Sequence, residues 1–302
     1  MTDNRLDRRL RAHHPDLSWA RIRSAIERGQ VTVDGHVVRE PAFTVQPSAA
    51  IVLDLGRPAL PTVRLALTRL YEDDDILVID KPAGLLTIAS RAEARATEDT
   101  VLRRVQDYAR RLHGRRAYAG VLHRLDRDTS GALALALSRA AHSAGRKLFA
   151  EHAFDRTYLA IVHGTPRRER GTVEAAISNS YVAGRRRIAS HDTGGRPAVT
   201  HYRVRERLRT AALLELILET GRQHQIRLHL QQLGHPLLGE AVYVDESLHT
   251  ETAVHAKRQM LHAWRLRFPH PLNQRRIAVE APIPEDFERL LTQLRSQRDL
   301  RR

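Results

Sequence analysis

The stretch that decides the fold runs Gly120-Val-Leu-His-Arg-Leu-Asp-Arg-Asp-Thr-Ser-Gly-Ala-Leu-Ala-Leu-Ala-Leu137. In it, a charged segment follows the apolar pair Val121 and Leu122 and precedes an apolar run over residues 132–137. Short apolar runs bounded by turn residues are typical of buried strands. Burying carboxylates beside arginines between such strands costs folding free energy, unless each charge is paired or serves a function. The stretch therefore predicts either a salt-bridged loop or a catalytic one.

Two carboxylates in this stretch are candidates for chemistry. Asp128 directly precedes residues 129–131, which can close the turn, and it could simply cap that turn. Asp126 lies between Arg124 and Arg127, and nearby positive charge keeps a carboxylate ionised. An ionised, oriented carboxylate can act as a nucleophile toward an electrophilic carbon of a sugar or a base. Spacing alone makes Asp126 only a modest favourite.

The segment from His123 to Gly131 resembles the signature of the RluA branch of pseudouridine synthases. In that family the aspartate that follows Arg-Leu is the catalytic residue, and this position is Asp126 here. The resemblance also implies that Arg124 supports the flipped-out conformation of the target nucleotide, by filling space or by holding phosphate. It leaves open whether Asp126 attacks the sugar or removes one of its protons.

Two further positions acquire roles from the resemblance. The turn Asp80-Lys81-Pro-Ala-Gly84 is similar to the first family motif, although the family often has Asn where this chain has Asp80. We expect Lys81 to have a supporting role, shaping the site or contacting RNA. Tyr158 lies in a predicted strand over residues 154–164, where an aromatic side chain is more often core. The family places a tyrosine in this Tyr-x-Ala-x-Val-x-Gly setting, which implies that Tyr158 stacks on the target base, with proton abstraction as an option.

The sequence Thr-Gly-Arg-Gln-His-Gln-Ile-Arg at 220–227 resembles the third family motif. On the residues alone it predicts the start of a polar helix over about 221–233. His224 and Arg227 are three residues apart and would share a face of that helix. The resemblance implies that Arg227 pairs with Asp126, which would keep the carboxylate ionised and hold its orientation.

The first 55 or so residues predict a small module of two helices and a hairpin. Helices are expected over 5–12 and 18–28, and alternating apolar residues around Asp34-Gly35 suit a tight hairpin turn. This order resembles the alpha-L RNA-binding module named after a small-subunit ribosomal protein, although a generic α+β cap would look similar. The arginines that lie off the apolar face of the second helix are expected to bind RNA, namely Arg21, Arg23 and Arg28.

A Pro-rich break near residues 56–61 separates this module from the rest of the chain. We expect an α+β fold in which the helix-helix-hairpin module over 1–56 and a linker over 57–65 precede a catalytic domain over 66–302. The resemblance implies that this domain is a mixed, largely antiparallel-sheet pseudouridine synthase domain. The acidic run at 73–75, just before a buried strand, is expected to be a solvated loop.

The composition favours a polyanionic partner such as nucleic acid. The chain has 302 residues, with 50 Lys+Arg against 35 Asp+Glu, although a genome rich in G and C would also encode many arginines. It has no cysteine, which excludes disulfides and a thiol nucleophile. Neither His224 nor His229 has a nearby carboxylate that would complete a metal site. Without a long apolar run or a signal-like leader, we expect a cytoplasmic protein, monomeric and without a membrane span.

The resemblance predicts an RNA pseudouridine synthase, an isomerase that breaks the bond between ribose and uracil N1 and rejoins the base through C5. No cofactor is expected, because nothing is added or lost and no Gly-rich nucleotide-binding loop is present. The target uridine would have to be flipped out of its stack. Ribosomal RNA of the large subunit is the expected substrate, with transfer RNA as the alternative. Two alternative hypotheses are a non-catalytic RNA-binding scaffold and an N-glycosidase that releases free uracil.

Overall fold

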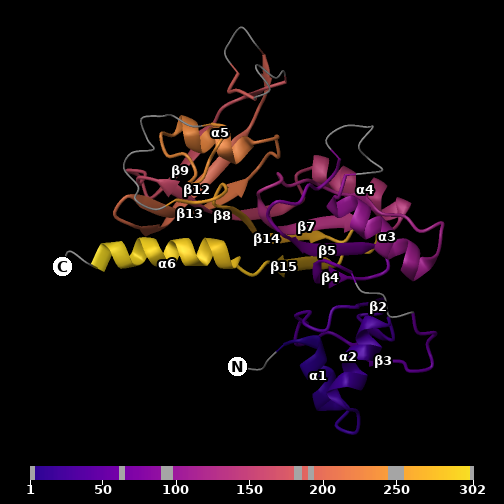
Figure 1. Ribbon diagram of the computed structural model, residues 1–302. Helices are drawn as coiled ribbons and strands as arrows, with labels where there is room; N and C mark the ends of the chain where they lie inside the picture. The colour runs from indigo at the N-terminus through magenta and orange to yellow at the C-terminus, as the bar shows by residue number, and fades with distance from the viewer. Residues whose placement is uncertain are drawn as a thin grey trace.

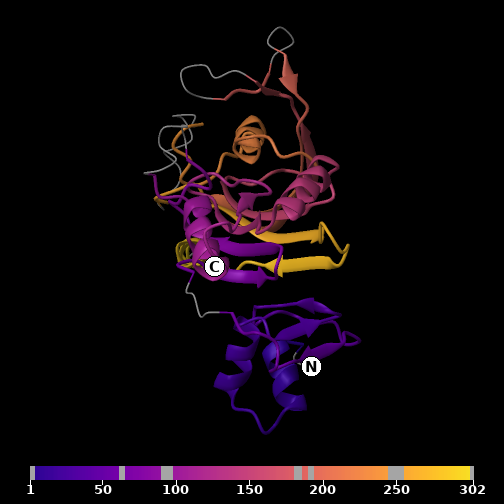
Figure 2. The same ribbon diagram turned by 90° about the vertical axis from the view of Figure 1, so that its right-hand side faces the viewer.

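A computed structural model of the protein describes residues 4–60, 65–89, 98–179, 186–189, 194–243 and 255–299. A small N-terminal part lies beneath a larger body that is built around one mixed sheet, as Figure 1 and Figure 2 show. This arrangement confirms the predicted α+β fold, with a helix-helix-hairpin module followed by a largely antiparallel sheet. The boundaries of the module, linker and catalytic domain stay a prediction.

The N-terminal module contains α1 (Leu6–His13), α2 (Trp19–Glu27), β1 (Val31–Val33), β2 (His36–Val37) and β3 (Ile51–Leu53). Its three strands form an antiparallel sheet in the order β2-β1-β3. Ser18 caps α2, because its side chain accepts a hydrogen bond from the Arg21 amide at 3.2 Å. The predicted hairpin turn is confirmed, since Asp34 and Gly35 both have positive φ angles, 52° and 81°.

The larger body is a ten-stranded sheet whose main path runs β4-β5-β7-β14-β8-β13-β12-β9, with β6 beside β7 and β15 beside β14. All paired strands are antiparallel except β7 and β14, which are parallel. The strands are β4 (Thr68–Glu72), β5 (Ile76–Lys81), β6 (Gly120–Val121), β7 (Ser130–Ala136), β8 (Asp155–His163), β9 (Arg170–Glu174), β12 (Val199–Arg207), β13 (Ala211–Leu218), β14 (Leu261–Pro269) and β15 (Arg276–Glu280). A separate pair is formed by β10 (Ile177–Ser178) and β11 (Gly195–Arg196).

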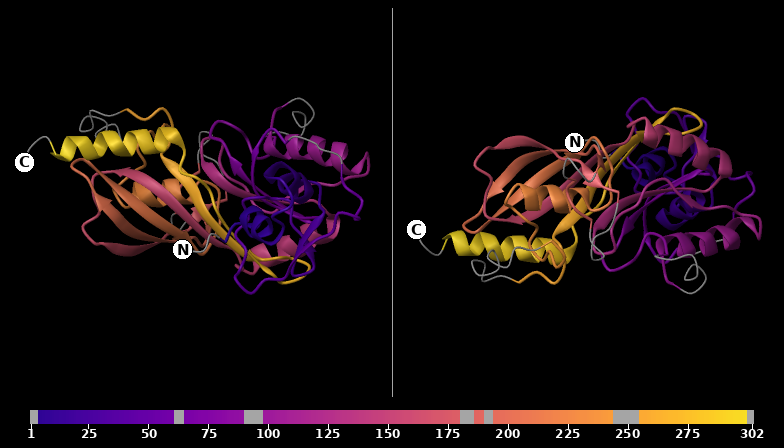
Figure 3. Two further views of the ribbon diagram at one scale, coloured as in Figure 1. Left: turned by 90° about the horizontal axis from the view of Figure 1, so that it is seen from below. Right: turned by 90° about the horizontal axis from the view of Figure 1, so that it is seen from above.

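The helices α3 (Val101–His113), α4 (Arg139–Ala150), α5 (Gln225–Gln232) and α6 (Glu285–Asp299) pack around this sheet, as the two views of Figure 3 show. Successive residues of β5 point to opposite faces of the sheet. Leu77 therefore joins a core with α3 side chains, while Ile76 joins a second core that includes Leu6 and Ile22 of the N-terminal module. No helix in the described part of the chain is long and apolar enough to cross a membrane.

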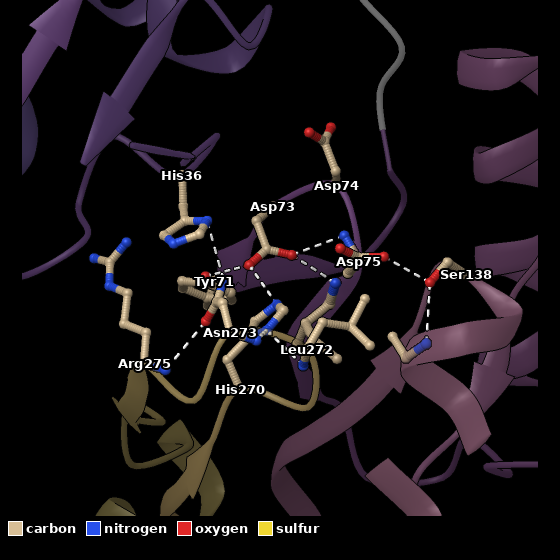
Figure 4. A network of polar contacts seen from close by, with 12 residues as sticks. His36, Tyr71, Asp73, Asp74, Asp75, Ser138, His270, Leu272, Asn273 and Arg275 are labelled. Atoms are coloured by element: carbon tan, nitrogen blue, oxygen red, sulfur yellow. Dashed lines mark hydrogen bonds and ion pairs between the residues drawn. The ribbon is translucent and has the colours of Figure 1, made fainter. Parts of the chain in front are cut away.

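The acidic run at 73–75 is only in part the solvated loop that its composition predicts, because Asp74 is exposed but Asp73 is buried. Asp73 is only 4% exposed, and its carboxylate accepts hydrogen bonds from two amides of its own turn and from the Tyr71 hydroxyl. His270 Nε2 lies 3.1 Å from the same carboxylate, as Figure 4 shows. The prediction was wrong for Asp73 because a partner from a distant part of the chain, rather than water, satisfies this charge.

The same region joins the N-terminal module to the sheet. Arg39 donates a hydrogen bond to the Asp73 carbonyl at 2.9 Å and forms an ion pair with Asp74. Nearby, Arg275 donates to the Val33 carbonyl at 3.1 Å, and its side chain lies close to the Asp73 network in Figure 4. These polar contacts, together with the shared apolar core, give the module a defined position against the sheet.

Candidate active site

The signature segment forms the loop between β6 and β7, and buried hydrogen bonds hold its backbone. The Thr87 hydroxyl donates to the Leu125 carbonyl at 2.7 Å and accepts from the Leu125 amide at 3.1 Å. The Asp126 carbonyl accepts a hydrogen bond from the Thr129 amide at 3.2 Å, which closes the turn. The Asp126 side chain keeps 19% of its surface exposed, so a rigid loop presents a reachable carboxylate.

Lys81 lies beneath this loop. Its side chain has no exposed surface, and its ammonium group donates to the carbonyls of Pro82, Leu85 and Arg127, each at 2.8 Å. Burial lowers the pKa of Lys81 to about 7, while nearby carboxylates act to raise it. A side chain without exposed surface cannot contact RNA in this structure. Of the two expected roles of Lys81, only shaping the site agrees with its position.

Asp126 and Tyr158 line a cavity of about 750 Å³ between the signature loop, α3, α4 and β8. A smaller space of about 60 Å³ adjoins it, and both are lined by Arg124, Asp126 and Tyr158. His224 and Arg227 line the smaller space. Burial raises the pKa of Tyr158, so the phenol is protonated at neutral pH, and this favours stacking over proton abstraction. The structure therefore brings together the residues that the sequence predicts at the site, except Lys81 and the arginines of the module.

The larger cavity is strongly cationic. Asp126 is its one carboxylate among the described lining residues, which also include Arg103, Arg124, Arg146, Arg156 and Arg222. Within the described ranges, no group of three His, Asp or Glu side chains could hold a metal ion. The charge of this cavity therefore suits a polyanion, and Asp126 is the one carboxylate among its described lining residues.

Arg227 faces Asp126, as the resemblance implies, but it also has a second and closer partner. Arg227 Nη1 lies 3.5 Å from Asp126 Oδ2, whereas its guanidinium donates to both Glu240 carboxylate oxygens at 2.6 and 2.8 Å. Burial would raise the pKa of Glu240, but the hydrogen bond and charge of Arg227 lower it below its usual range. Sequence analysis missed Glu240. No local pattern in the sequence marks Glu240 as a partner of Arg227.

His224 precedes the helix that was predicted to contain it. Helix α5 begins at Gln225, and His224 is its N-cap residue in the left-handed region, with φ 59° and ψ 17°. This turn replaces the first residues of the predicted helix. It still brings His224 and Arg227 to the same carboxylate, because His224 Nε2 lies 3.8 Å from Asp126 Oδ1.

The contacts of His224 decide which ring nitrogen carries the proton. The Arg186 amide donates to the Tyr243 hydroxyl oxygen at 3.3 Å, and that hydroxyl lies 2.6 Å from His224 Nδ1. The Asp126 carboxylate, which can only accept hydrogen bonds, faces Nε2, so the favoured neutral ring carries its proton on Nε2, and Nδ1 then accepts from the Tyr243 hydroxyl. Burial lowers the pKa of His224, while Asp126 raises it. At neutral pH, an uncharged donor thus faces the carboxylate.

The three arginines expected to bind RNA lie on the N-terminal module, and none of them lines the cavity. Arg23 pairs with Asp7 at 3.3 Å, and Arg28 donates to the Leu60 carbonyl at 3.1 Å. Arg21 is exposed and has no side-chain partner among the residues that the structure describes. Their role in RNA binding stays a prediction.

Comparison with known proteins agrees with this geometry. The model of the RNA pseudouridylate synthase family matches residues 75–232, and the S4 domain model matches residues 4–51. This chain belongs to the RNA pseudouridylate synthase family. It is therefore an RNA pseudouridine synthase, an isomerase, with an S4 RNA-binding domain at its N-terminus. The matched catalytic range contains Asp126, Tyr158 and Arg227, whereas Glu240 and Tyr243 lie beyond it.

Several curated proteins resemble this synthase along nearly its whole length. Ribosomal large subunit pseudouridine synthase D of Zymomonas mobilis is 36% identical, over 96% of this chain and 93% of that protein. The protein of the same name from Pseudomonas aeruginosa is 37% identical, over 98% of this chain and 93% of that protein. Among solved structures, Human RNA Pseudouridylate Synthase Domain Containing 4 superimposes with a TM-score of 0.62 at 25% identity, covering 76% of this chain and 93% of that chain.

Proposed function

We propose that this synthase isomerises uridine in large-subunit ribosomal RNA, with Asp126 as its catalytic carboxylate. The observation that carries the proposal is the convergence of Asp126 and Tyr158 in one cationic cavity, next to Arg227. The names of the relatives from Zymomonas mobilis and Pseudomonas aeruginosa favour ribosomal RNA over transfer RNA as substrate. The S4 domain supports a structured RNA.

The glycosidic bond of a stacked uridine is out of reach of Asp126, so the nucleotide has to be flipped into the cavity. Flipping costs a few kcal/mol of lost stacking and pairing. Tyr158 lies in the cavity wall and would stack on the extruded uracil. Arg124, which is exposed at the cavity, would hold the flipped-out conformation by filling space or contacting phosphate.

In the proposed reaction the bond between C1′ and N1 breaks, the uracil turns within the cavity, and a bond forms between C1′ and C5. The C5 proton is lost and N1 gains a proton, so the product is an isomer of the substrate. Asp126 either attacks C1′ or removes a proton from the sugar. Because Glu240 shares the charge of Arg227, Asp126 is oriented without being fully neutralised. A single carboxylate differs from the paired acids of glycoside hydrolases, which agrees with retention of the base.

Tritium release tests this proposal. Large-subunit ribosomal RNA carrying [5-³H]uridine is incubated with wild type, with Asp126→Asn and with Asp128→Asn as the matched control. We expect Asp126→Asn to lower the rate by about 10³-fold or more while RNA binding stays within about threefold. Asp128→Asn should keep most of the activity.

Other outcomes separate the alternatives. Near-normal turnover by Asp126→Asn would remove Asp126 from the chemistry. Release from transfer RNA alone would change the substrate, and free uracil among the products would indicate an N-glycosidase. Binding of ribosomal RNA without any release by wild type would favour a scaffold.

A further inference from the structure

One cavity-lining arginine has no counter-charge among the residues that the structure describes. Arg156 lies on β8, two residues before Tyr158, and is 5% exposed. Among the described residues its guanidinium forms no ion pair with a carboxylate, and its Nε atom is buried without a hydrogen-bond partner. The one hydrogen bond that it donates, from Nη2 to the Glu219 carbonyl, is long at 3.5 Å. A buried cation with so few partners destabilises a fold by several kcal/mol unless something else compensates.

The surroundings of Arg156 make room for its charge but do not neutralise it. Its guanidinium carbon lies 4.7 Å from the ring centre of Phe149. A Cβ atom at Gly221 would lie 2.4 Å from Arg156 Nη1, so the glycine of the third motif leaves space for the guanidinium. His123, which is buried nearby, has its pKa lowered to about 3 by burial and by the charge of Arg156, so it is neutral. The fold thus holds an uncompensated positive charge at the cavity.

The other four arginines of the cavity do not require a counter-charge, because they are exposed or half-buried and water can solvate them. Arg156 has little access to water, so its missing partner has to come from whatever fills the cavity. A guanidinium prefers a bidentate anion, and the anion that an RNA substrate carries is its phosphodiester. Residues 156 and 158 point to the same face of β8, about 7 Å apart along the strand. A nucleotide whose base stacks on Tyr158 can span that distance with its phosphate.

We propose that Arg156 is a binding site for one phosphodiester of the RNA substrate, which supplies the counter-charge that the described part of the protein does not provide. This inference rests on the proposed function, because it assumes that the target nucleotide enters this cavity. Arg156 would then anchor the sugar-phosphate next to the flipped uridine and fix the position of C1′ relative to Asp126. The uracil carbonyls are the competing ligands, but they are neutral and would leave the charge uncompensated.

The test combines binding with stability. Affinity for unmodified large-subunit ribosomal RNA is measured from 50 to 200 mM salt for wild type, Arg156→Met, Arg156→Lys and Arg110→Gln. Arg110 is an exposed α3 residue outside the cavity, paired with Asp107 at 2.7 Å, and serves as the control. We expect Arg156→Met to raise Kd about tenfold and to reduce the slope of log K against log salt by about 0.7 to 0.9, the contribution of one phosphate. Arg156→Lys should keep the slope, and Arg110→Gln should change neither quantity.

Thermal unfolding separates a binding role from a structural one. If substrate is the missing partner, Arg156→Met removes an uncompensated charge, and its Tm should equal or exceed that of wild type. A lower Tm with unchanged Kd would show that Arg156 is structural. A raised Kd with an unchanged salt slope would assign it to a neutral group such as a uracil carbonyl. If Arg156→Met does not fold, the structural role is indicated. Failure of wild type to form pseudouridine would instead overturn the proposed function.

Discussion

At the scale of single residues, Asp126 is held between two donors of different charge. Arg227 lies 3.5 Å from one carboxylate oxygen and shares its charge with Glu240, while neutral His224 lies 3.8 Å from the other oxygen. Both distances exceed those of direct hydrogen bonds, and such contacts often tighten only when substrate binds. The Tyr243 hydroxyl directs the His224 proton to the nitrogen that faces Asp126. A neutral donor can orient the carboxylate without weakening it as a nucleophile or base.

Replacing Tyr243 by Phe should therefore slow pseudouridine formation in a pH-dependent way. At pH 8 the His224 ring is free to carry its proton on Nδ1 and to turn a lone pair toward Asp126, which should lower the rate about tenfold. Because burial lowers the pKa of His224 below the usual imidazole value of about 6.5, protonation, which restores a donor on both nitrogens, requires a pH below 6. Single-turnover rates of Tyr243→Phe and wild type from pH 5 to 8 measure the ratio of the two rates, which should approach one only at the acid end of this range.

A glutamine at position 224 supplies the control, because its amide is a donor at every pH. Adding Tyr243→Phe to His224→Gln should produce no further pH-dependent loss. His224→Leu, which meets the same left-handed backbone strain, should lose more activity than His224→Gln. A ratio of Tyr243→Phe to wild type that stays constant across this pH range would show that the hydroxyl does not set the tautomer.

At the scale of elements, the site depends on how closely β7 approaches β14. These two strands are the parallel pair of the sheet, and Gly131 of β7 lies opposite Ala263 of β14. Gly131 has a φ of +114°, and a Cβ atom there would lie 2.2 Å from the Ala263 carbonyl oxygen. The glycine that ends the signature loop thus permits both the backbone angle and the strand contact. The loop carrying Asp126 is positioned by this pairing.

Gly131→Ala should consequently destabilise the protein by more than about 3 kcal/mol, because it combines backbone strain with a clash against main chain. Gly114→Ala is the matched control, since Gly114 ends α3 with a φ of +86° and open space around it. With ψ 179°, Gly114 lies in a region that is essentially restricted to glycine, so strain alone predicts a loss of about 1 to 3 kcal/mol there. Urea unfolding measures the loss of unfolding free energy in each variant. Equal losses for Gly131→Ala and Gly114→Ala would contradict the proposed role of the contact between β7 and β14.

At the scale of the whole molecule, a buried polar network joins the N-terminal module to the sheet. Asp73 is its centre, with Tyr71 and His270 on the side of the sheet and Arg39 on the side of the module. Although burial raises the pKa of Asp73, hydrogen bonds from His270, Tyr71 and the Asp75 amide lower it below the usual range. An ionised carboxylate therefore holds the turn whose main-chain carbonyl accepts a hydrogen bond from Arg39 of the module.

Asp73→Asn should destabilise the protein by about 2 kcal/mol at pH 7, because it removes charge-assisted hydrogen bonds. The folded pKa of Asp73 lies below its unfolded value of about 3.9, so the stabilisation is present above that value and is lost as the pH falls through the folded pKa. The stability difference between wild type and Asp73→Asn should thus be constant from pH 7 to 5 and shrink below pH 4. Urea unfolding at several pH values measures this difference in the free energy of unfolding. A difference that persists below pH 4 would show that Asp73 is not held ionised in the folded protein.

Much of the molecule could be predicted from local patterns. The second helix of the module, the Asp34-Gly35 turn and the buried run that forms β7 all depend on neighbours a few residues away, and each is confirmed. The long motif around Asp126 likewise led to the right family. Local patterns failed at the start of α5, where a left-handed residue, which periodicity does not reveal, precedes the helix.

The sequence by itself thus determined the order of elements, the enzyme family and the candidate carboxylate, because periodicity, turn chemistry and motifs are properties of adjacent residues. Only the tertiary structure decided which charges are buried and what they meet. In the tertiary structure Glu240 pairs with Arg227, and Lys81 is fully buried. Arg156 has no counter-charge among the described residues. The physical reason is that the environment of a charge depends on residues far away in the chain, whose approach leaves no local signal.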